Sequence, residues 1–134
     1  MTCLFCQIAN KEKPSHIIYE DDFVTAVLDV FPRVVGHTLV LPKKHAENIL
    51  DLSSEEIGPI FDAVKKVTAL LKEKLSPDGF TIGINHGKVS GQLIEHLHIH
   101  IMPRFLDDGG GSMHSIVNKP PKRDLEEVKK QILD

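Results

Sequence analysis

The sequence lacks the features that would direct a chain to a membrane, an oxidising compartment or a polyanion. Two cysteines among 134 residues are too few for a disulfide framework. No unbroken apolar run exceeds about five residues, far short of the roughly 18 needed to cross a bilayer. The net charge of −3 provides no general attraction for nucleic acid or anionic membrane. Charged residues at Lys11 and Glu12 precede any apolar segment that could serve as a secretory signal. We therefore expect a cytoplasmic protein with no nucleic-acid or membrane partner.

The remaining composition is ordinary for a globular domain, except for histidine. Hydrophobic residues make up 41% and charged residues 26% of the chain. The length fits one domain, and no repeat or linker divides residues 1–134. Eight histidines are present, and five of them fall within 37–45 and 96–100. These two segments are the first candidates for a functional site.

Periodicity along the chain predicts an α+β fold with a five-stranded antiparallel sheet, one long helix and one short helix. Residues 53–75 have apolar positions at helical spacing, and Ser53 with Glu56 forms a capping-box pattern at their start. A short helix is expected after Asp124, and residues 3–10 are compatible with a short helix or a turn. Consecutive strand patterns with a helix laid on one face indicate an antiparallel sheet. The expected strands cover residues 16–20, 23–30, 37–42, 80–85 and 96–104.

The segment 96–104 alternates strictly between histidine and apolar residues at its start. On a strand, His96, His98 and His100 share one face and neighbouring imidazoles are about 6.8 Å apart. The outer two are then about 13.6 Å apart along the strand, too far to bind one zinc ion together. Two adjacent histidines could share a metal. We therefore expect a division of labour, with one histidine as nucleophile and its neighbours orienting it or contacting the substrate.

The sequence HLHIHIM, together with an ordered set of further motifs, resembles the histidine triad (HIT) family of nucleotide hydrolases and transferases, and its zinc-bearing nucleotide-binding branch in particular. The resemblance covers a core over residues 3–104 and implies a HIT-like fold, which leaves residues 105–134 as a C-terminal extension with a short helix. The supporting motifs are FC-x-I near the start, Leu28-Asp29, GHTLVLPKKH over 36–45, Asn85, Gly91-Gln92 and Pro103-Arg104.

The resemblance implies catalysis at the α-phosphorus of a nucleoside 5′-phosphate derivative. His98 would form a covalent nucleotidyl-histidine, His100 would contact the phosphate or the leaving-group side, and His37 would join a proton relay. Asn85 and the backbone amides of 91–93 would hold the phosphate oxygens. The resemblance implies that Gly91, Gln92 and Leu93 bind the substrate there. Gln92 matches the family's usual residue. Leu93 stands where many members have a hydroxyl residue that bonds the leaving-group oxygen.

The resemblance also places the nucleoside. It assigns the ribose hydroxyls to Asp29, whose carboxylate can accept from a vicinal diol. It assigns the base to four apolar residues, which from composition alone would be interpreted as core: Phe5, Ile8, Leu28 and Val30.

Cys3 and Cys6 form a C-x-x-C pair, which in a reducing compartment is more often a metal or redox site. A redox pair normally follows a strand, and nothing precedes Cys3 that could form one. The pair is half of a common zinc site. The resemblance supplies His45 and His96 as the other ligands, and such a closed set implies one structural zinc per chain.

We therefore expect a nucleotide hydrolase acting on purine nucleoside phosphoramidates or adenylated compounds. The alternatives are a dinucleoside polyphosphate hydrolase, a nucleotide-binding regulatory module with slow turnover, and a hydrolase with catalytic zinc. A homodimer is also expected, because the family pairs two chains into one continuous sheet and residues 80–85 carry no charge or proline to protect a strand edge.

Overall fold

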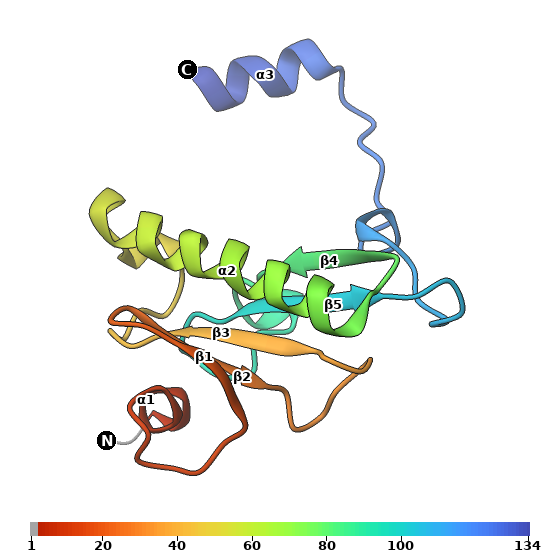
Figure 1. The fold of residues 1–134 in the computed structure, drawn as a ribbon. Coiled ribbons are helices and arrows are strands. Elements are labelled where there is room, and N and C mark those ends of the chain that lie inside the picture. Colours follow the sequence, from red (N-terminus) through yellow and green to blue (C-terminus); the bar gives the residue numbers. More distant parts are fainter. Residues whose placement is uncertain (1–2) are drawn as a thin grey trace.

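Five strands form one antiparallel sheet in the computed structural model, which describes residues 3–134 (Figure 1). The sheet order is β1-β2-β3-β5-β4, so β1 and β4 are its edges. This arrangement confirms the predicted α+β class and the antiparallel five-stranded sheet. The strands are β1 (Ile17–Glu20), β2 (Val24–Leu28), β3 (Thr38–Pro42), β4 (Gly79–Gly83) and β5 (Ile99–Arg104).

Two helices cover opposite faces of the sheet (Figure 1). The long helix α2 (Ser54–Leu75) begins at the predicted capping box, where Ser53 accepts from the Glu56 N–H and the Glu56 carboxylate accepts from the Ser53 N–H. The short helix α1 (Leu4–Ala9) occupies the segment for which the sequence predicts a helix or a turn. The core is therefore divided into one layer on each side of the sheet.

The layer beneath α2 contains the apolar residues that alternate with the histidines. Leu97, Ile99 and Ile101 are fully buried there against Val64 and Val67 of α2. The predicted alternation of faces is thus present, and the histidines point to the other side of the sheet.

The layer beneath α1 is smaller and holds that helix close to the histidines. Phe5 and Ala9 pack with Val27 and Leu39. The buried Thr25 hydroxyl donates to the Ala9 carbonyl at 2.7 Å, which fixes the end of α1 on β2. The histidine face is consequently covered over part of its length rather than open to solvent.

The prediction that β5 begins at residue 96 is wrong by three residues. The strand starts at Ile99, and His96 to His98 precede it. In that stretch the Leu97 N–H donates to the Ala46 carbonyl at 2.7 Å, so the chain is held by the segment after β3 instead of by a strand partner. The histidine spacing is also shorter than predicted, since the rings of His98 and His100 lie 5.1 Å apart.

The C-terminal helix α3 (Leu125–Leu133) begins at Asp124, whose side chain accepts from the Glu126 N–H as predicted. None of its residues is buried, and the helix stands away from the sheet (Figure 1). The described residues also include three single-turn 3-10 helices: η1 (Ile49–Asp51), η2 (Lys88–Ser90) and η3 (Met113–Ser115). Among the described residues, no helix combines the length and apolar character needed to span a membrane.

Candidate functional site

The pairing of β3 with β5 brings the three predicted catalytic residues together. His37 directly precedes β3, His100 lies on β5, and the pairing of Leu39 with His100 places these ends side by side. The rings of His37 and His100 are 5.2 Å apart. His98, two residues before His100, completes the cluster, which lies beside the short stretch where β3 pairs with β5.

The hydrogen bond made by His98 fixes which of its ring nitrogens carries the proton. Its Nδ1 lies 2.7 Å from the His96 carbonyl oxygen. A carbonyl can only accept, so Nδ1–H donates and Nε2 of the neutral ring retains its lone pair. The Phe5 ring packs edge-on against His98 at 4.9 Å and restricts its rotation. His98 is thereby held as an oriented base or nucleophile.

A second chain of hydrogen bonds fixes the protons of His37 and His100. The Arg33 backbone N–H donates to His37 Nδ1 at 3.1 Å, so the proton of the neutral His37 ring is on Nε2. That group donates to His100 Nδ1 at 2.9 Å, with Asp29 Oδ2 at 3.5 Å as a further neighbour. The remaining proton of His100 is then on Nε2, which is buried and has no hydrogen-bond partner among residues 3–134. His100 Nε2–H is an unused donor.

Burial keeps these rings neutral. Loss of solvation, with smaller contributions from His98 and His37, lowers the pKa of His100 to about 4. Burial also lowers the pKa of His37, although Asp29 opposes the shift. Both rings are therefore uncharged near pH 7, as the assigned hydrogen-bond chain requires.

A cavity of about 380 Å³ opens beside His98 and His100, and we call it the histidine cavity. Its apolar wall comes from α1 and β2, and its polar end from the histidines, Asn85 and Asp29. It contains ten of the predicted substrate-binding residues: Phe5, Ile8, Leu28, Asp29, Val30, Asn85, Gly91, Leu93, His98 and His100. Further residues that the sequence did not predict also line the cavity. They lie singly in loops or at a helix end, where the sequence has no periodic pattern that would identify them. They include Leu4, Pro14, Ser15, Phe31 and Ile94.

Gln92 is the predicted substrate residue that does not line the cavity. Its side chain is buried and accepts from the Gly87 N–H at 2.8 Å, while its amide donates to the Glu47 carbonyl at 2.8 Å. Next to it, Gly91 has a φ of 104°, a conformation that favours glycine. The Gln92 side chain thus shapes the loop that faces the histidines.

Asp29 has two roles at the edge of this cavity. Its Oδ1 accepts from the Phe31 N–H at 2.9 Å, which fixes the turn after β2. Its Oδ2 is directed to His37. Because Asp29 also lines the cavity, a bound group there could reach the same carboxylate.

Four donor groups converge at the N-terminus of α1 and form a candidate metal centre. The ligand atoms of Cys3, Cys6, His45 and His96 all lie within 4.8 Å of one another. His96 Nδ1 is 3.4 Å from each sulfur and 3.2 Å from His45 Nδ1. Tetrahedral zinc with ordinary bond lengths separates two nitrogens by about 3.3 Å and a nitrogen from a sulfur by about 3.5 Å. The spacing therefore fits a four-coordinate ion.

The protonation of these groups also suits a metal ion. His96 Nε2–H donates to the Pro42 carbonyl at 2.9 Å, which leaves the Nδ1 lone pair directed at the sulfurs. Burial lowers the pKa of His96 to about 4, so the ring is in its neutral, ligating form. Burial and the neighbouring Cys3 sulfur raise the pKa of Cys6 to about 11, so Cys6 needs a nearby cation to become a thiolate near neutral pH. The described residues can therefore hold a metal ion at this site.

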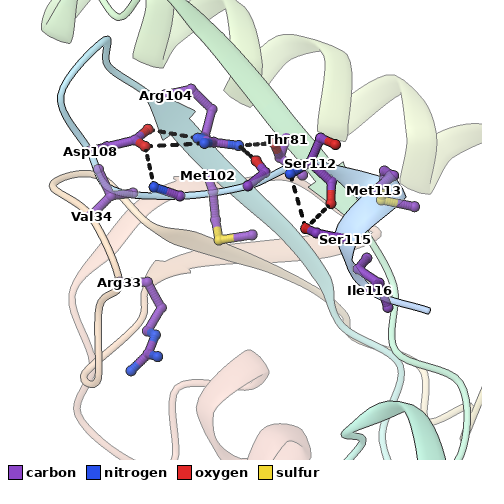
Figure 2. Close-up of a pocket in the computed structure, with 12 residues that line it drawn as sticks. Arg33, Val34, Thr81, Met102, Arg104, Asp108, Ser112, Met113, Ser115 and Ile116 are labelled. Carbon is purple, nitrogen blue, oxygen red and sulfur yellow. Dashed lines mark hydrogen bonds and ion pairs between the residues drawn. The ribbon is translucent and has the colours of Figure 1, made fainter. Parts of the chain in front are cut away.

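A second cavity, of about 270 Å³, shares His100 and Asn85 with the histidine cavity but has no α1 residue in its lining, and the sequence did not predict it. Arg33, Met113 and Ile116, all labelled in Figure 2, line it together with His37 and Asn85. Their spacing along the chain contains no motif, because the loop after β2 and the segment around η3 meet only in the folded protein.

Comparisons with known proteins find related chains and a similar fold. A curated relative from Methanocaldococcus jannaschii, described as an uncharacterized HIT-like protein, is 44% identical over 97% of this chain and 98% of its own length. The adenosine 5′-monophosphoramidase of Schizosaccharomyces pombe is 36% identical over 82% of this chain and 80% of that protein. A crystal structure of a HIT family member from Bacillus subtilis superposes with a TM-score of 0.86 at 35% identity, covering 98% of this chain and 95% of the other. The family model for the HIT domain matches residues 10–107, and the chain belongs to the HIT family.

Proposed function

We propose that the protein is a nucleotide hydrolase that cleaves at the α-phosphorus of purine nucleoside phosphoramidates or related adenylated compounds. The observation that carries this proposal is the pair of ring nitrogens at the histidine cavity: His98 Nε2 with a free lone pair, and His100 Nε2–H without a partner. A nucleophile and a proton donor side by side are what displacement at phosphorus requires. The 36%-identical relative named adenosine 5′-monophosphoramidase supports the same substrate class.

In the first half of the reaction, His98 Nε2 forms a bond to the phosphorus and the bond to the leaving nitrogen breaks. The leaving nitrogen keeps the bonding electron pair and takes the proton of His100 Nε2–H. The His100 ring then carries a negative charge beside the positively charged nucleotidyl-His98 ring, and His37 Nε2–H, already directed at His100 Nδ1, stabilises it. The His96 carbonyl meanwhile accepts from His98 Nδ1–H and stabilises the positive charge that develops on the nucleophilic ring.

In the second half, water attacks the phosphorus of the nucleotidyl-histidine. Its proton passes to His100 Nε2, and His98 departs as a neutral ring. The nucleoside monophosphate and the free amine are the products. Asn85 and the backbone amides of 91–93 would hold the non-bridging oxygens as negative charge accumulates.

The nucleoside would lie in the rest of the histidine cavity. Phe5, Ile8, Leu28 and Val30 provide apolar surface for a purine, and Asp29 Oδ2 is available to the ribose hydroxyls. Leu93 is exposed and has no hydroxyl, so protonation of the leaving group depends on His100.

Two further features belong to this proposal. The metal at Cys3, Cys6, His45 and His96 is zinc, because two thiolates and two imidazoles in tetrahedral spacing are its preferred ligands. The set leaves no open position, so the zinc is structural. The functional unit is a homodimer in which β4, at the edge of the sheet, pairs with its symmetry mate.

The test is to trap the covalent intermediate. We expect intact-protein mass spectrometry after rapid quenching with adenosine phosphoramidate to show an adenylylated chain, and His98→Ala to show none. His98→Ala should also reduce turnover by several orders of magnitude, since nucleophile removal typically costs about 10⁴- to 10⁶-fold.

His16→Ala is the matched control because His16 is exposed and lies outside the cavity; it should retain adduct and turnover. Diadenosine polyphosphate is assayed in parallel. Adduct formation in His98→Ala would contradict the nucleophile assignment, and faster cleavage of the polyphosphate would replace the proposed substrate class with the alternative.

A further inference from the structure

Two buried side-chain polar atoms have no hydrogen-bond partner within residues 3–134, and both belong to residues that line the histidine cavity. One is His100 Nε2, which the proposed reaction uses. The other is the hydroxyl oxygen of Ser15, to which that reaction gives no role. A buried hydroxyl without a partner costs stability, so such groups are ordinarily paired. The Ser15 hydroxyl is therefore a second candidate for a contact with a bound ligand.

Other buried hydroxyls of the sheet do have partners. The Thr25 hydroxyl donates to the Ala9 carbonyl at 2.7 Å, and the Thr38 hydroxyl donates to the Gly36 carbonyl at 2.8 Å. Such bonds hold neighbouring segments together, as is usual for buried hydroxyls with a structural role. Ser15 makes no such bond to the part of the chain that the structure describes, so its hydroxyl does not hold the local structure together.

The register of β1 with β2 sets Ser15 opposite Asp29. The Leu28 N–H donates to the His16 carbonyl at 3.0 Å, which continues the antiparallel ladder by one residue beyond β1. One further step brings Ser15 and Asp29 to paired positions, where side chains lie on the same face with their Cβ atoms about 4.5–5.5 Å apart. Both residues line the histidine cavity, so they face the same space.

Asp29 lies between Ser15 and the histidines. On the side away from Ser15, the Asp29 N–H donates to the His37 carbonyl at 2.9 Å, and His37 Nε2 in turn contacts His100. The four residues thus form a row across the sheet, from Ser15 on the β1 side to His100 on β5. A substrate whose phosphorus lies at the histidines would reach Asp29 first and Ser15 only with its more distant atoms.

The Asp29 carboxylate has limited capacity for two ribose hydroxyls. Its Oδ1 accepts from the Phe31 N–H at 2.9 Å, and its Oδ2 faces His37 Nε2 at 3.5 Å. Oδ2 is thus the oxygen that is available to a ligand, and the second hydroxyl of a vicinal diol needs another partner. A serine hydroxyl both donates and accepts, so it can pair with a sugar hydroxyl in either direction.

We propose that Ser15 binds the ribose 2′-hydroxyl and makes the protein selective for ribonucleotides over 2′-deoxyribonucleotides. Along the sugar ring, the 3′ carbon is closer to the 5′-phosphate than the 2′ carbon is. With the phosphate at His98 and His100, the 3′-hydroxyl lies at Asp29 and the 2′-hydroxyl at Ser15. The inference rests on the proposed function, since it requires a nucleoside 5′-phosphate in the histidine cavity. Ser15 is a specificity residue and takes no part in the chemical step.

The experiment measures binding and turnover with sugars that lack one hydroxyl. Isothermal titration calorimetry gives the Kd of adenosine 5′-monophosphate and of its 2′-deoxy and 3′-deoxy analogues, and kcat/KM is measured for the 5′-phosphoramidates of the same three nucleosides. For the wild-type protein we expect the ribonucleotide to bind about three- to tenfold more tightly than the 2′-deoxy analogue, the range of one neutral hydrogen bond. The kcat/KM values should have a similar ratio, because the contact is present in both the ground state and the transition state.

Ser15→Ala should bring the ratio between the ribonucleotide and the 2′-deoxy analogue to about one. It should leave the penalty of the 3′-deoxy analogue unchanged, because that hydroxyl faces Asp29. Removal of an unpartnered buried hydroxyl should not lower the Tm of the ligand-free protein, which separates a loss of selectivity from a loss of fold. The matched control is Ser54→Ala, which removes an exposed hydroxyl at the start of α2, outside the histidine cavity, and should retain both ratios.

The outcomes distinguish this inference from the proposed function. A wild-type ratio of one, or a ratio that persists in Ser15→Ala, would overturn the assignment of Ser15, while turnover of adenosine 5′-phosphoramidate would still support the proposed function. Equal reductions of the 2′-deoxy and 3′-deoxy penalties in Ser15→Ala would also overturn the assignment, because Ser15 would then act on the whole sugar. Selective nucleotide binding that Ser15→Ala abolishes, without any turnover, would support Ser15 and overturn the proposed function. Absence of both binding and turnover would overturn both.

Discussion

His100 uses one ring nitrogen to accept from His37 and leaves the other, a buried donor, without a partner. An unpaired buried N–H ordinarily costs stability, so its presence at the cavity is consistent with a group reserved for a ligand. The sequence could predict that three histidines share a face. It could not predict their tautomers, because the deciding partners are the Arg33 amide and the His96 carbonyl, backbone groups that only the folded chain brings into reach.

Acid should destabilise the fold partly through His100. Its pKa is about 4 in the folded protein and near 6.5 in the unfolded chain, so between these values the unfolded chain binds more protons. The free energy of unfolding should therefore fall as the pH decreases from about 6.5 to about 4. His100→Gln removes this titration, and urea unfolding at pH 7.5 and pH 5 should show a smaller loss than in the wild type. His16→Gln, at an exposed histidine, should keep the wild-type loss; an equal loss in His100→Gln would contradict the expectation.

Among the elements, those fixed by local interactions were predicted best. The beginning of α2 follows from its capping box, and the start of α3 from the Asp124 cap. The start of β5 was predicted wrongly because the Leu97 N–H bonds to Ala46, about fifty residues away, instead of extending the ladder. The second cavity beside His100 was missed for the same reason: its walls include two loops that are distant in sequence.

The end of α2 offers a test of local backbone strain. Ser76 adopts a left-handed conformation with a φ of 49°, which costs a residue with a Cβ about 1–2 kcal/mol. Glycine avoids this penalty but loses more chain entropy. Ser76→Gly should therefore raise the free energy of unfolding by about 0.5–1 kcal/mol in urea titrations. Lys65→Gly, in the exposed middle of α2, should lower it by about 1 kcal/mol, and a loss in both variants would show that Ser76 is not strained.

We expect helix α1 to depend on the candidate metal centre at its N-terminus. With six residues it is too short to be stable alone, and Cys6 is among the proposed ligands. The purified protein should contain about one zinc per chain by elemental analysis. The Cys3→Ser/Cys6→Ser variant should lose the zinc and show a lower Tm, because metal-binding energy contributes to folding.

His16→Ala serves as a control that should retain zinc. Absence of zinc in protein prepared without chelators would refute the metal identity, and zinc loss with unchanged Tm would refute its structural role.

At the scale of the molecule, β4 is an uncovered edge and α3 is a helix with an unburied apolar side. An edge strand without charge or proline readily pairs with another copy. We expect light scattering to give about twice the 15.0 kDa chain mass across a wide dilution range. Ile82→Lys should shift the mass towards the monomer, because Ile82 is exposed on this strand and a charge there opposes edge pairing. Leu50→Lys, equally apolar but on η1, should leave the mass unchanged, and a wild-type monomer would contradict the dimer.

The position of α1 between the candidate metal centre and the histidine cavity has a thermodynamic consequence. One short helix carries Cys6 on the metal side and Phe5 and Ile8 on the cavity side. If the ion orders this helix, it raises the affinity of the cavity for its ligand. Linkage then requires the bound nucleotide to raise the equilibrium affinity for the ion by the same factor. Substrate abundance would thereby set how firmly the protein retains its metal in the presence of competing chelators.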